Sequence, residues 1–169
     1  MTAVNSTGEP SLAERAGRAL LAAGLHAVTA ESCTGGGIAS ALTDVPGSSQ
    51  WFERGYVTYS NEAKIQDLGV EPAALERHGA VSAAVAEQMA AGALRASGAE
   101  LAVAVTGVAG PEGGTLEKPV GLVYLAIARR GGPVSVVREL FAGDRVAVRC
   151  ATVAAALKML IAAAEGRGF

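Results

Sequence analysis

The stretch "ESCTGGG" at residues 31–37 combines a hydroxyl, a thiol and three successive glycines directly before an apolar run. Ser32 falls where a short strand gives way to a helix, and the first N–H groups of a helix have no partner within it. Such groups can bind an anion or stabilise an oxyanion. Three roles remain open for Ser32: a nucleophile, a phosphate contact, or a helix cap, which Thr34 could provide equally well. The thiol of Cys33 could rival Ser32 as the nucleophile.

A serine nucleophile needs a base, and Lys64 is the best candidate. It falls in the first turn or so of a helix, where the dipole opposes its positive charge and burial would lower the pKa of its amine. A lysine with a lowered pKa can act as a general base. The alternative is an ordinary solvated lysine. Tyr59 could orient Lys64 or donate to the reacting centre, or be a core-strand aromatic. No sequence argument brings His26, at a strand start, or His78, in a loop, near Ser32.

A glycine-rich loop, "GVAGPEGGTLEKP", supplies a second set of candidate contacts. It follows the apolar strand "ELAVAVT", and its thirteen residues are long for a plain connection. Thr106 ends this strand, and Gly107 and Gly110 would let the backbone approach a ligand closely. The loop has no Walker A pattern, "GGGIAS" fails the Rossmann fingerprint, and the S-x-x-K of β-lactamases is absent.

Arg145, in the "GDR" that opens the last helix, is a candidate anion contact. A positive charge at a helix N-terminus opposes the dipole, so helix stability does not explain its position. It could clamp a phosphate or a carboxylate. The alternative is a surface arginine paired with Asp144 or Glu139.

The composition bounds the kind of protein. The chain has 169 residues, of which 50% are hydrophobic, which suits one compact domain over 11–169 after a loose polar segment over 1–10. The net charge of -2 argues against nonspecific nucleic-acid binding. Two isolated cysteines form neither a zinc site nor a disulfide framework, so we expect no metal. Arg149 and Lys158 interrupt the apolar stretch 146–164, which disfavours a membrane span, and we expect a cytoplasmic protein.

Strands alternate with helices along the chain, which predicts a three-layer α/β/α sandwich with a mixed, mostly parallel sheet. Because ligands bind beyond the carboxyl ends of strands in such sheets, "ESCTGGG", "YSNEAK" and "TGVAGPEGGT" should converge. Helices are expected from Ser11 to near Gly24, over 35–45, from about Asn61 to Gly69, over 82–97 with an apolar stripe at Val85, Met89, Ala93 and Ala96, and from near Asp144 to about Ala164; strands are expected over 26–31, 54–60, 100–106, 120–128 and 133–141.

Six motifs in register resemble the CinA C-terminal domain family: "AESCTGG", "LTDVPGSS", "YSNEAK", "HGAVS", "AVTGVAGPEGGTLEKPVG" and "FAGDR". The resemblance runs from about residue 11 to the end. Many members of this family are nicotinamide-nucleotide amidases, also called NMN deamidases. Larger members carry an additional N-terminal domain resembling molybdopterin-binding proteins, and this chain looks like the stand-alone form. Gly37 departs from the family pattern, in which a larger apolar residue is usual.

The resemblance implies a metal-independent amidase that converts nicotinamide mononucleotide to nicotinic acid mononucleotide and ammonia. It implies that Ser32 is the nucleophile and Lys64 its base, with Tyr59 close by, and that backbone amides from Thr34 to Gly36 hold the oxyanion. The residues expected to contact the nucleotide are Cys33, Thr34, Gly35, Gly36, Thr106, Gly107, Gly110 and Arg145.

The partner expected from this resemblance is a small pyridine nucleotide, without a cofactor, a nucleic acid or a membrane. The alanine-rich helices would permit close contact between copies, and we expect a homo-oligomer. Two alternatives remain. One is a nucleotide-binding or interaction module of the competence/DNA-damage type with little amidase activity. The other is a related amidase with a different pyridine-nucleotide or amide substrate.

Overall fold

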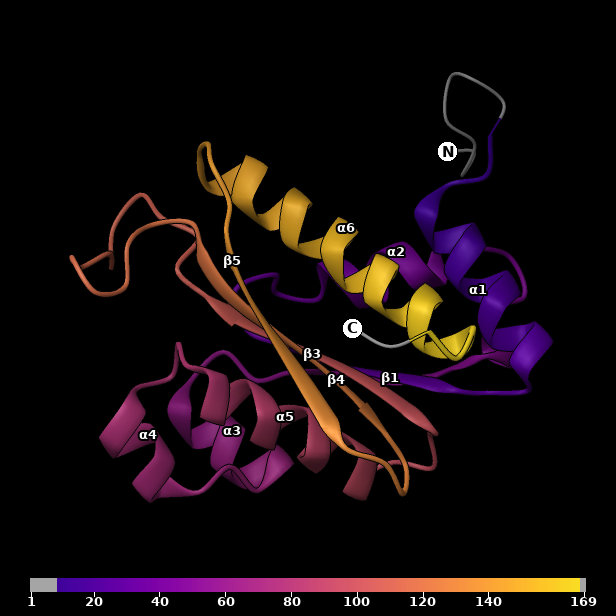
Figure 1. The fold of residues 1–169 in the computed structure, drawn as a ribbon, viewed down its shortest axis with the longest axis horizontal. Coiled ribbons are helices and arrows are strands. Elements are labelled where there is room, and N and C mark those ends of the chain that lie inside the picture. Colours follow the sequence, from indigo (N-terminus) through magenta and orange to yellow (C-terminus); the bar gives the residue numbers. More distant parts are fainter. Residues whose placement is uncertain (1–8, 168–169) are drawn as a thin grey trace.

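The computed structural model of the protein describes residues 9–167, in which helices cover both faces of one mixed sheet (Figure 1). The loose segment expected over 1–10 lies almost wholly outside the described residues. The elements are α1 (Leu12–Ala23), β1 (Ala27–Glu31), α2 (Gly37–Thr43), the 3-10 turn η1 (Ser48–Gln50), β2 (Phe52–Val57), α3 (Asn61–Leu68), α4 (Pro72–His78), α5 (Ala83–Arg95), β3 (Leu101–Gly107), β4 (Leu122–Arg129), β5 (Val134–Leu140) and α6 (Arg145–Ala164).

The strands are ordered β2-β1-β3-β4-β5 across the sheet. Strand β1 is parallel to both of its neighbours, β2 and β3, whereas β4 is antiparallel to both β3 and β5. Every strand except β4 therefore points the same way. The predicted mixed, mostly parallel sheet is confirmed, and the carboxyl ends of β1, β2 and β3 meet at one edge.

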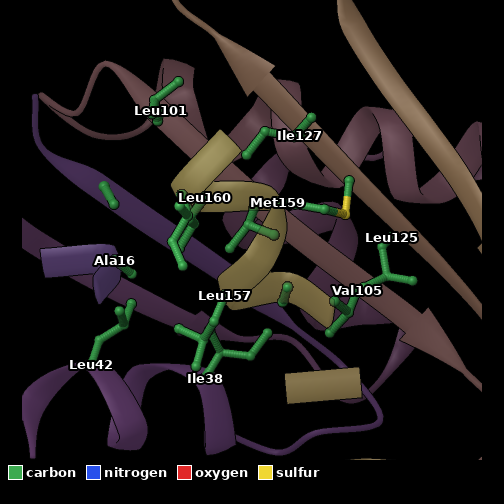
Figure 2. Packing of buried hydrophobic residues seen from close by; sticks show 14 of the residues in the cluster. Ala16, Ile38, Leu42, Leu101, Val105, Leu125, Ile127, Leu157, Met159 and Leu160 are labelled. Carbon is green, nitrogen blue, oxygen red and sulfur yellow. The ribbon is translucent and has the colours of Figure 1, made fainter. Parts of the chain in front are cut away.

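Two hydrophobic clusters hold the layers together. Helices α1, α2 and α6 lie on one face, and α3, α4 and α5 on the other (Figure 1). On the first face, Leu157 and Leu160 of α6 lie among side chains of the sheet that include Leu125 (Figure 2). On the second face, Val85, Met89 and Ala93 of α5 are fully buried, as their helical spacing predicts. Burying a side chain such as that of Met89 contributes about 1.5–3 kcal/mol. Ala96, the fourth residue of the predicted stripe, is exposed because it lies past the last residue of the helix.

Helix α6 is long and apolar enough to cross a membrane by length and composition alone, with a mean hydropathy of 1.8. In the fold it packs against β3, β4 and α1, the position of a core helix. Asp144 caps it by accepting a hydrogen bond from the N–H of Ala147 at 2.9 Å. The helix starts where the sequence predicts, and this start directs Arg145 toward the carboxyl edge of the sheet.

Helix α3 begins at Asn61, as the sequence predicts, and Ser60 caps it because its Oγ accepts from the N–H of Ala63 at 3.0 Å. Two local predictions are corrected. His78 is the last residue of α4, a helix that the sequence analysis did not predict, and not a loop residue. Tyr59 lies beyond the end of β2 and is not a core-strand aromatic.

Candidate active site

A cavity of about 280 Å³ opens at the edge where the parallel strands end. The first turn after β1, the segment after β2, the end of β3 and the start of α6 all contribute to its walls. The predicted site residues that line it are Ser32, Cys33, Tyr59, Lys64, Thr106, Gly107, Gly110 and Arg145. Thr34, Gly35 and Gly36 are not among its lining residues.

Ser32 and Lys64 form a close pair in this cavity. The Nζ of Lys64 lies 3.1 Å from the Oγ of Ser32, 2.7 Å from the main-chain oxygen of Thr58 and 3.4 Å from that of Tyr59. A neutral amine can give its two N–H groups to the two carbonyls and keep its lone pair for the hydroxyl proton. An ammonium can donate to all three oxygens. The site can therefore hold both protonation states of a general base without moving its side chain.

The surroundings of Lys64 favour its neutral form. Its side chain is only 1% exposed, and no carboxylate pairs with it in the described part of the chain. Burial lowers the pKa of Lys64, because a charge that is removed from water without an opposite charge is destabilised. A lowered pKa increases the fraction of amine that can accept a proton near neutral pH.

Cys33 is a poorer nucleophile than Ser32 in this environment. Its side chain is buried, and burial raises the pKa of its thiol to about 11. The charge of Glu31 raises this pKa further. The thiol is therefore protonated at neutral pH, and the thiolate is the reactive form of cysteine.

The turn after β1 is closed by its own backbone. The N–H of Ser32 donates to the main-chain oxygen of Val105 on β3 at 3.1 Å, and the oxygen of Ser32 accepts from the N–H of Gly35 at 3.0 Å. Gly35 and Gly36 have φ values of 59° and 93°, which side-chain-bearing residues rarely adopt. The N–H of Gly35 is already bonded within the turn, whereas Cys33, next to Ser32, lines the cavity.

Neither Ser32 nor Thr34 caps α2, contrary to one of the roles left open by the sequence. The helix begins after Gly36, which makes no side-chain bond. The carboxylate of Glu31 takes the role of the cap and accepts from the N–H groups of Ile38 and Ala39. Glu31 is not among the site residues predicted from the sequence, although an acidic residue shortly before a helix start is a recognisable signal.

Arg145 contributes the positive charge of the site. Its guanidinium donates to the main-chain oxygen of Gly110 at 2.9 Å and to the hydroxyl of Tyr59 at 3.2 Å. It forms no ion pair with Asp144, Glu139 or any other carboxylate among residues 9–167, so the surface-pair alternative does not hold. Its charge remains available for an anion, the group that arginine recognises best.

Hydrogen bonds also hold other residues of the cavity wall in place. Thr106 donates from its hydroxyl to the main-chain oxygen of Ala80 at 2.8 Å, which holds the segment before α5 against the end of β3. Tyr59 is exposed, and it joins the two ends of the site because its carbonyl faces Lys64 while its hydroxyl faces Arg145. Glu112, in the glycine-rich loop, also lines the cavity and was not predicted.

Elsewhere among residues 9–167 no cavity brings together comparable groups. A larger groove of about 850 Å³ lies beside α6 and β5, but no serine, cysteine or histidine is among its lining residues. His26 lies 3.5 Å from a carboxylate oxygen of Glu100, and neither histidine lines the cavity of Ser32. In residues 9–167 no three side chains of His, Cys, Asp or Glu are grouped as a metal ion requires.

The fold and the site define a three-layer α/β protein in which a half-buried serine contacts a buried lysine at the carboxyl edge of the sheet. Residues 9–164 match the model of the CinA C-terminal domain, and the chain belongs to this family.

Its relatives include proteins named for an enzymatic activity. Nicotinamide-nucleotide amidohydrolase PncC of Escherichia coli (strain K12) is 54% identical over 149 residues, which is 88% of this chain and 90% of that protein. The PncC of Pseudomonas putida is 56% identical over 151 residues, 89% of this chain and 94% of that protein. The solved structure of the competence/damage inducible protein CihA from Agrobacterium tumefaciens has a TM-score of 0.88 and 49% identity, covering 96% of this chain and 98% of that one.

Proposed function

We propose that the protein is a nicotinamide-nucleotide amidohydrolase that converts nicotinamide mononucleotide to nicotinic acid mononucleotide and ammonia. The observation that carries this proposal is the 3.1 Å contact between the Oγ of Ser32 and the Nζ of a buried Lys64. The names and the 54–56% identity of the two PncC relatives support the choice of substrate.

The first half of the reaction forms an ester. Ser32 attacks the carboxamide carbon of the nicotinamide ring while neutral Lys64 takes the hydroxyl proton. The oxygen of the tetrahedral intermediate accepts a hydrogen bond from the N–H of Cys33, and from Thr34 or Gly36 if the turn adjusts on binding. The intermediate collapses when the C–N bond breaks, and the proton held by Lys64 leaves with the nitrogen as ammonia. The pyridinium charge makes the carbonyl carbon more electrophilic.

The second half releases the product. A water molecule enters the place vacated by ammonia and attacks the nicotinoyl ester while Lys64 removes its proton. The ester bond breaks, Ser32 recovers its proton from Lys64, and nicotinic acid mononucleotide leaves. Because one amine serves both halves, its pKa must lie near the working pH, which is the direction of the shift that burial causes.

Charged side chains of the cavity orient the substrate. Arg145 binds the phosphate, and Tyr59 holds the guanidinium in place. Glu112 is the one carboxylate among the residues that line this cavity and lies in the loop that would face the cationic ring. Gly107 and Gly110 line the cavity, but a Cβ at either position would meet Leu122, Val123 or Val120, so these glycines serve the packing of the loop and not the close approach to a ligand that the sequence predicts.

The reaction as written needs no metal, because Ser32 and Lys64 supply the nucleophile and the base. The expectations of a homo-oligomer in the cytoplasm, without a nucleic-acid or membrane partner, stay predictions. Light scattering of the purified protein would test the first of these.

The direct test is ammonia release from nicotinamide mononucleotide in the presence of EDTA. The proposal expects turnover that EDTA does not change and that Ser32→Ala abolishes. A binding module of the competence/damage type would bind the nucleotide without releasing ammonia. A related amidase would release ammonia from another pyridine nucleotide but not from this one.

A further inference from the structure

Glu31 is a fully buried carboxylate next to the nucleophile, and the reaction described above gives it no role. Its Oε2 accepts from the hydroxyl of Thr34 at 2.7 Å and from the N–H of Ile38 at 3.0 Å. Its Oε1 accepts from the N–H of Ala39 at 2.8 Å. No cation pairs with it in the described part of the chain, so these three donors and the N-terminal end of α2 stabilise its charge.

These bonds close the turn that carries Ser32. Glu31 is the last residue of β1, and its side chain reaches seven and eight residues along the chain to the first turn of α2. Ser32 and the following glycines lie within the loop that is closed in this way. Since Gly36 offers no side chain to cap α2, the carboxylate is the group that fixes the helix start relative to the strand end.

The main chain of Glu31 reaches the other member of the pair. Its carbonyl oxygen accepts from the N–H of Thr58 at 2.9 Å, and the carbonyl oxygen of Thr58 accepts from the Nζ of Lys64 at 2.7 Å. Glu31 therefore holds the turn of Ser32 through its side chain, and through its backbone it holds Thr58, whose carbonyl accepts from Lys64.

We infer that Glu31 is a positioning residue that holds the hydroxyl of Ser32 at hydrogen-bond distance from Lys64. This inference rests on the proposed function, since it concerns the same pair. A carboxylate suits this position because both of its oxygens accept, and three donors converge on them. A glutamine has one acceptor oxygen, and its amide N–H₂ would face a backbone N–H donor. Glu31→Gln preserves the shape of the side chain but allows the turn to shift.

The test compares Glu31→Gln with Glu14→Gln. Glu14 also caps a helix, because its carboxylate accepts from the N–H of Ser11 at 2.7 Å, but it lies on α1 outside the cavity. Both variants and the wild type are assayed for ammonia release well below their melting temperatures. A displacement of about 1 Å in a reacting group can lower the rate by about 10²-fold. We therefore expect a fall of this size in kcat for Glu31→Gln with an unchanged KM, and wild-type values for Glu14→Gln.

A kcat of Glu31→Gln equal to that of Glu14→Gln, or a change confined to KM, would overturn the inference. If Glu31→Gln does not fold, Thr34→Val decides: it removes one donor to the carboxylate and keeps the charge. It should lower kcat by a smaller factor at an unchanged KM, and a wild-type kcat would refute the positioning role. A wild type that releases no ammonia would instead contradict the proposed function.

Discussion

Replacing Lys64 by alanine tests the roles in the pair more sharply than any other single change. The substitution removes the only side-chain amine within hydrogen-bond distance of Ser32 in the described residues. It also removes the 2.7 Å donor from the carbonyl of Thr58, a fully buried residue. The truncation also removes one of the largest fully buried side chains, so it costs stability through lost packing as well as about 1–3 kcal/mol for the unsatisfied carbonyl, and the variant is assayed well below its melting temperature.

The expected loss of activity follows from the role of a general base. Such a group contributes about 10²–10⁴-fold, or about 3–5 kcal/mol of transition-state stabilisation. The neighbouring Cys33 cannot replace it near neutral pH, since burial raises its pKa to about 11. In the wild type the rate should rise with pH as Lys64 loses its proton, with a midpoint below the ordinary lysine pKa of about 10.4. The rate of the variant should not show this rise. It should recover only in part, and only at high pH, where hydroxide can act as the base.

The assay is kcat/KM for ammonia release from nicotinamide mononucleotide across the pH range, at a temperature where all proteins are folded. Lys158→Ala is the matched control, because this lysine is exposed on α6 and does not line the cavity. It should reproduce the wild-type profile. A Lys64→Ala variant with wild-type rate, or with the wild-type pH profile at a lower rate, would refute the assignment of Lys64 as base.

Three further outcomes are expected. Arg145→Ala should raise KM for the mononucleotide by about 10- to 100-fold, since a hydrogen bond to a charged group contributes about 1.5–3 kcal/mol, and should leave KM for the phosphate-free riboside unchanged; equal losses for both would argue against a phosphate contact. Iodoacetamide should modify exposed Cys150 and spare buried Cys33 at neutral pH, as peptide mass spectrometry would reveal, and rapid labelling of Cys33 would contradict its raised pKa. Finally, burial lowers the pKa of Lys64, so the unfolded state binds the extra proton and wild-type stability rises with pH up to about 10.4. The difference in free energy of unfolding between Lys64→Met and the wild type, measured by urea unfolding, should therefore favour the variant most at lower pH and shrink toward pH ~10.4. A difference that stays constant with pH would show that the pKa of Lys64 in the folded state is not shifted.

Much of the fold could be predicted because the local signals agree with the tertiary structure. Gly24 and Gly69 end α1 and α3 in the left-handed conformation, and Ser82 caps α5 by accepting from the N–H of Val85. The nearly unbroken apolar run of β3 reflects burial on both faces of the sheet. Helix α4 was missed although Pro72 at its first turn is a recognised start signal.

The site could be predicted only in part, because its geometry arises between segments. The spacing of 32 residues between Ser32 and Lys64 carries no distance information, and only the parallel pairing of β1 with β2 brings their ends together. The direction of a side chain at a strand end was equally inaccessible. The side chain of Glu31 turns inward and accepts from the hydroxyl of Thr34, so Thr34 does not cap α2. The sequence does not predict this direction.

The most direct measurement of the central claim is the fate of nicotinamide mononucleotide on the wild type and on Ser32→Ala. Ser32→Ala removes the hydroxyl and leaves Lys64 its two carbonyl partners, so the cavity should persist. We expect ammonia release by the wild type with EDTA present, and nucleotide binding without turnover by Ser32→Ala, with binding measured by calorimetry. Binding without turnover by both proteins, or comparable turnover by both, would contradict the claim.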